Sequence, residues 1–208
     1  MRDYKIIGLT GPTGSGKSSI CNILKENANV AIIDTDKIAR LATYKESSCY
    51  YTLGAVFGKE IYDIDGNINR QKLANIAFLS KENTKKLNDI VHPWVFLKTF
   101  EQIKIHSNNN AKLIFIDAPV LIESNANFIC DYVLSVICPL EIRLKRIIKR
   151  DNITKENALK RIEAQNDDDF YINSSDFVID GSITFDKLKI EVDKFLTKLN
   201  EVNNYVRK

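Results

Sequence analysis

Five short apolar runs are spread along the chain, and longer segments separate them. The runs are YKIIGLT (4–10), VAIID (30–34), KLIFID (112–117), DYVLSVI (131–137) and DFVID (176–180). Their length and β-branched content are typical of strands buried on both faces. Such strands with intervening helices predict an α/β fold, a five-stranded parallel sheet flanked by helices. The loops after these strands then meet at one edge, where open α/β sheets bind ligands.

Two segments near the C-terminus have the apolar spacing of helices. Apolar residues recur every three or four positions from Phe185 to Leu199, with charged residues on other faces. This spacing predicts a helix that packs on the core and has no residues that indicate chemistry. Another helix is predicted to begin at Thr154, a residue type that suits a helix N-cap.

The stretch between the second and third strands is far longer than one crossover helix requires. It contains FGKEIYDIDGNINRQKL and then a long segment from Ser80 to His106, which Pro93 interrupts. We interpret this stretch as a mostly helical insertion that builds a second ligand pocket.

The composition is that of an ordinary globular protein. The chain has 208 residues, 44% of them hydrophobic and 27% charged, with a formal net charge of +3. This length suits one domain, or a core with a small inserted lobe. The charge is too small to indicate nucleic-acid binding by itself, and a weakly basic surface suits anionic metabolites.

The four cysteines stand at positions 21, 49, 130 and 138, with no C-x-x-C pair. This spacing fits neither a zinc site nor a small disulfide framework, and it indicates buried or incidental thiols in a reducing compartment. No apolar run approaches the roughly 20 residues that span a bilayer. The first residues lead into a strand and a glycine loop rather than a signal peptide. We therefore expect a cytoplasmic protein without a membrane partner.

The glycine-rich segment from Gly11 to Ser18 satisfies the full pattern G-x-x-x-x-G-K-[ST]. It follows a predicted strand and precedes a predicted helix, which is the context of a P-loop. The glycines let main-chain N–H groups turn toward a triphosphate, and the helix N-terminus adds a favourable dipole. The motif predicts a P-loop NTPase whose ATP-binding residues are Gly11, Pro12, Thr13, Gly14, Ser15, Gly16, Lys17, Ser18 and Ser19.

Three side chains near this loop suggest how ATP and Mg²⁺ are held. Lys17 is expected to reach the β- and γ-phosphates, and the Ser18 hydroxyl to ligate Mg²⁺. The run LIFID ends in Asp117, as expected of a Walker-B strand. Asp117 is therefore a candidate for holding the magnesium, directly or through water. Alternatively, it only orders the turn into APVLIE.

The segment IIDTDKIAR offers two acids, Asp34 and Asp36, at the end of the second strand. A carboxylate near the γ-phosphate is suited to accept the proton of an attacking hydroxyl. Alternatively, these acids cap the helix that starts near Lys37. We favour Asp36 as the base.

The segment IRLKRIIKRD places Arg143, Arg146 and Arg150 along one helical stripe. Such a stripe usually means a solvated charged face, but phosphoryl transfer also needs cations over the transferring group. Arg150 stands where the helix gives way to DNIT, and we therefore expect it to be a lid arginine.

Several segments together resemble the dephospho-CoA kinase family, whose members phosphorylate the ribose 3′-hydroxyl of dephospho-CoA. The segments are GLTGPTGSGKSS, IIDTDKIAR, FGKEIYDIDGNINRQKLANIAF, LNDIVHPWV, APVLIE, LKRIIKRDNIT, EAQ and SDFVID. They keep the family's order and spacing over about residues 5–199. The P-loop is common to many enzymes, whereas D-x-D-x-I-A-R, D-G-x-I-x-R, H-P and P-x-L-x-E are much more specific.

The resemblance implies a single domain of the nucleoside-monophosphate-kinase type. Its predicted parts are a core in 1–45 and 111–199, a helical acceptor lobe in about 46–110 and a lid in about 146–170. It also implies ATP with Mg²⁺ as phosphate donor and dephospho-CoA as acceptor.

The resemblance carries residue roles as well. Asp36 corresponds to the catalytic base for the 3′-hydroxyl, and Arg146 and Arg150 match the lid segment on the ATP side. The remaining residues that the resemblance places on the acceptor side are Arg40, Arg70, His92 and Glu123.

Two segments depart from the family pattern. Its loop usually reads G-G-I-G-S-G-K, whereas Pro12 and Thr13 stand here, and Pro12 removes one N–H donor. After DFVID the family commonly has Asn and Gly, whereas Gly181 and Ser182 follow here. We expect nucleotide contacts at that turn to differ.

Three other functions share parts of these motifs. The string GPTGSGK also occurs in tRNA prenyltransferases, but these are generally longer, and the weak charge gives no footprint for RNA. A nucleoside-monophosphate kinase is closer in fold, but the H-P and P-x-L-x-E segments suit it less well. A GTP-dependent switch would use the D-x-x-G match from Asp63 to Gly66, but its N-K-x-D motif is missing. The sequence therefore predicts a kinase that converts dephospho-CoA to CoA, without a nucleic-acid partner.

Overall fold

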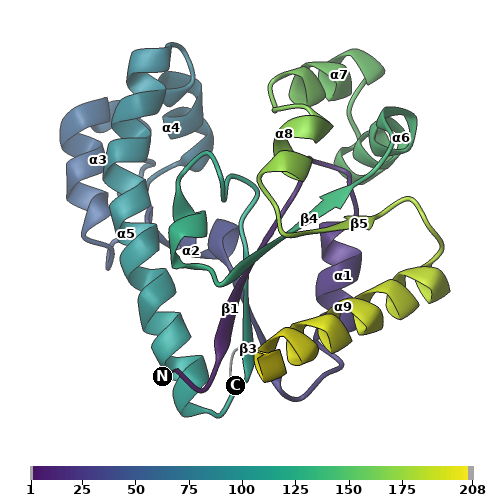
Figure 1. The fold of residues 1–208 in the computed structure, drawn as a ribbon. Coiled ribbons are helices and arrows are strands. Elements are labelled where there is room, and N and C mark those ends of the chain that lie inside the picture. Colours follow the sequence, from purple (N-terminus) through teal and green to yellow (C-terminus); the bar gives the residue numbers. More distant parts are fainter. Residues whose placement is uncertain (1, 206–208) are drawn as a thin grey trace. The chain divides into compact units, whose positions relative to one another are not determined.

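The computed structural model describes residues 2–205 and contains a five-stranded sheet. The strands are β1 (Lys5–Thr10), β2 (Val30–Asp34), β3 (Leu113–Asp117), β4 (Tyr132–Ile137) and β5 (Phe177–Asp180). Their order across the sheet is β2-β3-β1-β4-β5 (Figure 1). The pairs β1–β3, β1–β4 and β4–β5 are parallel. The predicted α/β fold with five strands is therefore confirmed.

The register of the sheet brings the strand ends together. Leu9 of β1 lies opposite Asp117 of β3, and Thr10 lies opposite Ser135 of β4. Since the paired strands are parallel, the segments that follow β1, β3 and β4 leave the sheet at one edge. The glycine loop and the turn after Asp117 are therefore neighbours at that edge.

The chain divides into two compact units. The first unit comprises residues up to 32 and from 106 onward. Helices α1 (Lys17–Leu24) and α9 (Phe185–Tyr205) pack against the sheet in this unit (Figure 1). The apolar side chains between them include Ile7, Leu9, Ile20, Leu24, Phe115, Leu134, Val136, Val192, Phe195 and Leu199. The predicted C-terminal packing helix is thus confirmed, and its apolar stripe completes the core.

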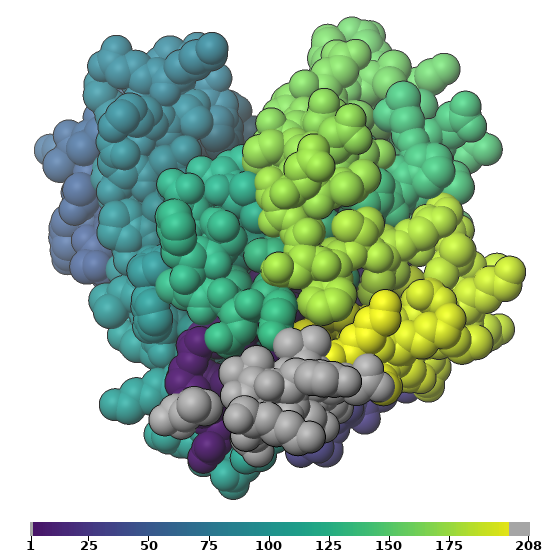
Figure 2. All heavy atoms as spheres, viewed as in Figure 1, coloured from purple at the N-terminus to yellow at the C-terminus, as the bar shows by residue number. Residues whose placement is uncertain are grey.

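Three helices connect β4 to β5 in the same unit, namely α6 (Leu140–Asp151), α7 (Lys155–Glu163) and α8 (Asp168–Asn173). The Thr154 side chain accepts the Asn157 N–H and caps α7, as predicted. A short 3₁₀ helix, η2 (Ala126–Ile129), follows the turn after β3. Light-green atoms of α7 and α8 lie at the surface of this unit (Figure 2).

The second unit, residues 33–105, is mostly helical. Its elements are α2 (Thr35–Leu41), α3 (Cys49–Phe57), η1 (Lys59–Ile61), α4 (Arg70–Ala77) and most of α5 (Lys81–Asn108). A separate apolar core forms around Leu53, Phe57, Ile61 and Leu73. The predicted core, acceptor-lobe and lid ranges remain predictions about function.

The prediction that Pro93 interrupts the segment from Ser80 to His106 is wrong. Helix α5 runs through Pro93 without a break in its assignment. Proline removes one N–H donor from a helix, but Ile90, Val91 and Trp94 around it pack against the core of this unit. Packing on both sides of the proline therefore outweighs the local cost. Within residues 2–205, no helix is both long and apolar enough to cross a bilayer.

Candidate active site

The glycine loop after β1 has a backbone that only glycine adopts readily. Gly11, Gly14 and Gly16 have φ angles of 132°, 78° and 113°, a region that side chains disfavour. A Cβ at Gly11 would lie 2.3 Å from the Val136 carbonyl oxygen, and one at Gly14 would lie 2.9 Å from that of Arg143. The glycines therefore provide both the turn and its close packing on the neighbouring backbone.

Lys17 begins the helix that follows this loop. Gly16 is the N-cap of α1, and the first turn contains no acidic residue. The positive end of the helix dipole is therefore not offset by a nearby carboxylate in that turn. The Lys17 ammonium donates to the Gly11 carbonyl and lies across the loop. This combination of ammonium, helix N-terminus and glycine loop suits a polyphosphate.

Ser18 and Asp117 have the chemistry of a magnesium site. Ser18 lies exposed in the first turn of α1, and Asp117 ends the adjoining strand β3. Cys21, three residues beyond Ser18, donates its thiol to Asp117 Oδ2 at 3.5 Å. Residues three apart share a helix face, so Ser18 and Asp117 lie toward the same side of α1. Hydroxyl and carboxylate oxygens are ligands that Mg²⁺ prefers, so the residues fit this ion.

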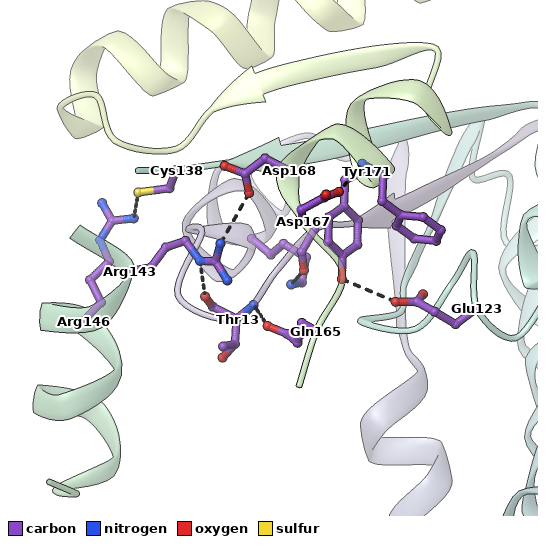
Figure 3. Close-up of polar contacts among 12 residues, drawn as sticks. Thr13, Glu123, Cys138, Arg143, Arg146, Gln165, Asp167, Asp168 and Tyr171 are labelled. Atoms are coloured by element: carbon purple, nitrogen blue, oxygen red, sulfur yellow. Dashed lines mark hydrogen bonds and ion pairs between the residues drawn. The ribbon is translucent and has the colours of Figure 1, made fainter. Parts of the chain in front are cut away.

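The arginine stripe of α6 faces the glycine loop. Arg143 Nε donates to the Thr13 carbonyl at 3.1 Å, and Arg146 donates to the carbonyls of Gly14 and Ser15 at 3.2 Å. Arg143 is only 5% exposed, and Figure 3 shows it between Thr13 and Asp168. The alternative interpretation of a solvated charged face does not hold for Arg143, whose buried guanidinium bonds to the Thr13 carbonyl and to Asp168.

Arg146 also joins the loop to the turn after β5. Its guanidinium donates to the Gly181 carbonyl at 2.9 Å and to Cys138 Sγ at 3.5 Å. A Cβ at Gly181 would lie 1.9 Å from the Ser15 carbonyl oxygen. The glycine that departs from the family pattern thus allows this turn to touch the P-loop. Burial raises the pKa of the Cys138 thiol, and Arg146 partly opposes this shift.

Arg150, at the end of the stripe, is largely exposed and contacts the loop through a side chain. Its guanidinium donates to Thr13 Oγ1 at 3.3 Å and to both carboxylate oxygens of Asp151, at 2.8 and 3.0 Å. Arg161 pairs with the same carboxylate at 2.6 Å. The hydrogen bond from Arg150 is the largest cause that lowers the pKa of Asp151. Two cations thus gather around an ionised carboxylate beside the loop.

Glu123, in the turn that follows β3, is the predicted acceptor-side carboxylate of this unit. It is exposed, and its Oε1 accepts hydrogen bonds from Asn166 at 3.1 Å and from the Tyr171 hydroxyl at 3.4 Å. Figure 3 shows Tyr171 directed toward Glu123. The carboxylate is therefore held in place by Asn166 and Tyr171, which lie between α7 and β5 in the chain.

The second unit contains the two acids of the IIDTDKIAR segment. Asp34 is the N-cap of α2, where its side chain accepts the Lys37 N–H at 2.9 Å. It also pairs with the Lys37 ammonium at 3.3 Å. Asp36 lies in the first turn of α2 and is exposed. The capping role thus belongs to Asp34, and Arg40 lies exposed in the last turn of the same helix.

The remaining predicted acceptor residues lie on two other helices of this unit. Arg70 is exposed at the start of α4, which Asn69 caps. The Asp63 carboxylate before it accepts two main-chain N–H groups, at 3.0 and 2.7 Å, so the D-x-x-G match forms a tight turn. His92 lies on α5, where desolvation lowers its pKa and Asp89 partly offsets the shift.

Sequence reasoning missed Gln165, Asp168 and Tyr171, which contact or adjoin the site, and it placed Arg143 on the arginine stripe without identifying its contact with the P-loop. Gln165 Oε1 accepts the Thr13 N–H at 2.8 Å, and Asp168 pairs with Arg143 at 3.3 Å. The EAQ segment and the spacing of the arginine stripe were the available signals. Neither could identify a partner more than a hundred residues away in the chain.

Comparison with known proteins gives a consistent result over nearly the whole chain. The family model described as Dephospho-CoA kinase matches residues 5–186. The dephospho-CoA kinase of Listeria monocytogenes is 37% identical over 194 residues, which cover 93% of this chain and 96% of that protein.

Solved structures agree with the sequence comparison. The dephospho-CoA kinase of Campylobacter jejuni superposes with a TM-score of 0.71 at 26% identity, covering 98% of this chain and all 100% of the other. A protein of Thermus thermophilus gives a TM-score of 0.81 at 28% identity, covering 94% and 98% of the two chains.

Proposed function

The chain belongs to the dephospho-CoA kinase family, the transferases of the last step of CoA biosynthesis, and we propose how its residues carry out the reaction. ATP donates its γ-phosphoryl group to the ribose 3′-hydroxyl of dephospho-CoA, giving CoA and ADP. The observation that carries the donor side is the complete P-loop, with its left-handed glycines and with Lys17 across it.

The phosphate groups of ATP bind to the loop N–H groups and to cations around them. Lys17 stabilises the β- and γ-phosphates from within the loop. Arg150 is the cation of the lid, because its exposed guanidinium already reaches the loop at Thr13. Arg146 donates mainly to main-chain carbonyls, and in our proposal it supports the shape of the ATP site.

Ser18 and Asp117 would hold Mg²⁺, directly or through water. The ion would neutralise negative charge on the β- and γ-phosphate oxygens when it is bound with ATP. The hydroxyl and carboxylate oxygens of these two residues support this assignment.

Asp36 is the proposed base for the acceptor hydroxyl. Its carboxylate accepts the 3′-hydroxyl proton while the new O–P bond forms and the bond to the ADP oxygen breaks. The Asp34 side chain caps α2, and Asp36 is the second residue of that helix and is exposed. The capping role of Asp34 supports Asp36, rather than Asp34, as the base.

The acceptor is proposed to bind Arg40, Arg70, His92 and Glu123. Arg40 and Arg70 are exposed cations, which suit the phosphate groups of dephospho-CoA. The lowered pKa of His92, caused first by desolvation, favours a neutral imidazole that donates or accepts a hydrogen bond. Glu123 offers a carboxylate to donors on the acceptor.

We place the enzyme in the cytoplasm, with ATP and dephospho-CoA as partners and without nucleic acid. All four cysteines are free thiols, which suits a reducing compartment. The weak net charge of +3 supports small anionic partners rather than RNA.

The purified chain should convert dephospho-CoA to CoA when it is incubated with Mg-ATP. The assay includes nucleoside monophosphates and tRNA with a prenyl donor as competing substrates, and CoA and ADP are quantified. Turnover of either competing substrate, with none of dephospho-CoA, would overturn the proposal.

A further inference from the structure

Residues 165–171, which include the first part of α8, contact both predicted substrate sides within the first unit. We call them the 165–171 segment. Gln165 accepts the Thr13 N–H of the P-loop at 2.8 Å, and the next residue, Asn166, donates to Glu123 at 3.1 Å. Two neighbouring residues thus reach the ATP side and the predicted acceptor side.

An ion pair between the buried Arg143 and the partly exposed Asp168 strengthens the link to the P-loop. Arg143 donates from Nε to the Thr13 carbonyl at 3.1 Å and pairs with Asp168 of the segment at 3.3 Å. A buried guanidinium is costly unless partners satisfy it, and Arg143 is only 5% exposed. The N–H and the carbonyl of Thr13 are therefore both held by the segment or by its ion-pair partner.

Tyr171 ends the segment and strengthens the link to Glu123. It is fully buried, and its hydroxyl donates to Glu123 Oε1 at 3.4 Å. Burial and the nearby Glu123 charge raise its pKa to about 12, so the hydroxyl remains a donor at neutral pH. Its carbonyl accepts the hydroxyl of Ser175 at 2.7 Å and that of Ser135 in β4 at 3.3 Å. Ser135 thus connects the Tyr171 backbone to β4 of the sheet.

We propose that the 165–171 segment is a positioning element, in which Tyr171 and Asn166 orient Glu123 for the acceptor while Gln165 holds Thr13 for ATP. The inference rests on the proposed function in one respect, namely that Glu123 contacts dephospho-CoA. Tyr171 acts through Glu123 and is a positioning residue rather than a catalytic one. The proposal predicts that a change at Gln165 weakens the use of ATP, whereas a change at Tyr171 weakens the use of dephospho-CoA.

The Tyr171→Phe substitution tests the acceptor end. It keeps the buried ring and removes only the hydroxyl. We expect the KM for dephospho-CoA to rise about fivefold to tenfold, as for the loss of one hydrogen bond of ordinary strength, with the KM for ATP changed less than about twofold. The matched control is Tyr132→Phe, which removes a hydroxyl that contacts Lys5 and should leave both KM values unchanged.

The Gln165→Met substitution tests the other end of the segment. It keeps the side-chain length and removes the acceptor of the Thr13 N–H. We expect the opposite pattern, a KM for ATP raised about threefold to tenfold and an unchanged KM for dephospho-CoA. Damage to the fold would raise both KM values in both variants, and that outcome would overturn the proposal.

A double-mutant cycle with Glu123→Ala shows whether Tyr171 acts through Glu123. Tyr171→Phe should add nothing to Glu123→Ala, because the hydrogen bond is already absent. An equal effect of Tyr171→Phe in both backgrounds overturns the positioning role. If the KM for dephospho-CoA is normal in Tyr171→Phe but raised in Glu123→Ala, the positioning role of Tyr171 is overturned, whereas the acceptor contact of Glu123 is retained. A normal dephospho-CoA KM in Glu123→Ala instead contradicts the acceptor contact on which the proposal rests.

Discussion

Single residues in this chain have roles that their neighbours define. Asp34 and Asp36 are two residues apart, but Asp34 accepts the Lys37 N–H and caps α2, whereas Asp36 is exposed in the first turn. A carboxylate that caps a helix has one oxygen committed to the backbone. The exposed carboxylate is thus better suited to exchange a proton with a substrate hydroxyl.

Asp36→Asn should lower kcat by at least about 10²-fold while ATP binding is largely kept, because an amide cannot accept the hydroxyl proton. The measurement is steady-state kinetics together with an ATP-binding titration. Asp34→Asn is the matched control, since Asn caps helices as well as Asp does, and it should keep a near-normal kcat. Near-normal kcat in Asp36→Asn would move the base to another residue.

Tyr171 predicts a pH dependence of stability. Burial first, and then the Glu123 charge, raise its pKa from 10.0 to about 12. A raised pKa in the folded state means that the unfolded chain loses this proton first as the pH rises. The resulting stabilisation is complete below the unfolded pKa of 10.0 and is lost as the pH rises through about 12.

Denaturant unfolding of the wild-type chain and of Tyr171→Phe measures this effect. The difference between their free energies of unfolding should be constant near neutral pH and should decrease above pH 10. Subtracting the variant removes the titration of other tyrosines and lysines. A difference that stays constant up to about pH 12 would show that the hydroxyl does not titrate as described.

At the scale of elements, helix α6 decides how the P-loop is covered. Three of its arginines reach the loop: Arg143 and Arg146 bind main-chain carbonyls, and Arg150 binds the Thr13 hydroxyl. Only Arg150 combines this reach with an exposed guanidinium. The first two arginines thus shape the loop, and the third is available to cover a phosphate.

Arg150→Ala should slow the chemical step by about 10²-fold or more, with a smaller effect on the KM for dephospho-CoA, because it removes charge from the transferring group. Single-turnover rates at saturating substrates measure this step. Arg161→Ala is the control, since Arg161 shares Asp151 with Arg150. Its rate should stay within a few-fold of wild type. An effect of Arg150→Ala on acceptor affinity alone would contradict the lid role.

At the scale of the whole molecule, two compact units divide the predicted roles. The P-loop, the α6 arginines and Glu123 belong to the first unit, whereas Asp36, Arg40, Arg70 and His92 belong to the second. In our proposal, the loops of the first unit hold ATP, and Asp36 of the second unit is the base. Changes to P-loop residues of the first unit should therefore weaken ATP binding when it is measured in the full chain.

Mg-ATP should stabilise the full chain against thermal unfolding. At about 100 times the Kd, binding to the native state alone adds about 2.7 kcal/mol, and Lys17→Met should lose most of this stabilisation. The control is Lys25→Met, which changes an exposed lysine at the other end of α1 and should keep the full shift. Equal shifts in both variants would contradict the role of Lys17.

The sequence by itself determined the five strands, the α7 cap and the P-loop. These features depend on neighbours within a few positions, because hydrophobic period, capping and glycine turns are local. Pro93 shows the limit of local rules, since packing of Ile90, Val91 and Trp94 keeps α5 continuous. The assigned roles of the site residues, including Asp36 and Glu123, stay predictions that the experiments above address.

Only the tertiary structure decided which distant groups meet. Thr13 lies 130 residues from Arg143 and 152 from Gln165, and no periodicity in the sequence encodes such a contact. Gly181 has a reason to be glycine only because the P-loop touches it at Ser15. In the sequence, the buried Arg143 cannot be distinguished from a surface arginine, because its burial depends on partners that are distant in the chain. Local patterns therefore specify the elements, and the packing of those elements decides which polar groups are desolvated and paired.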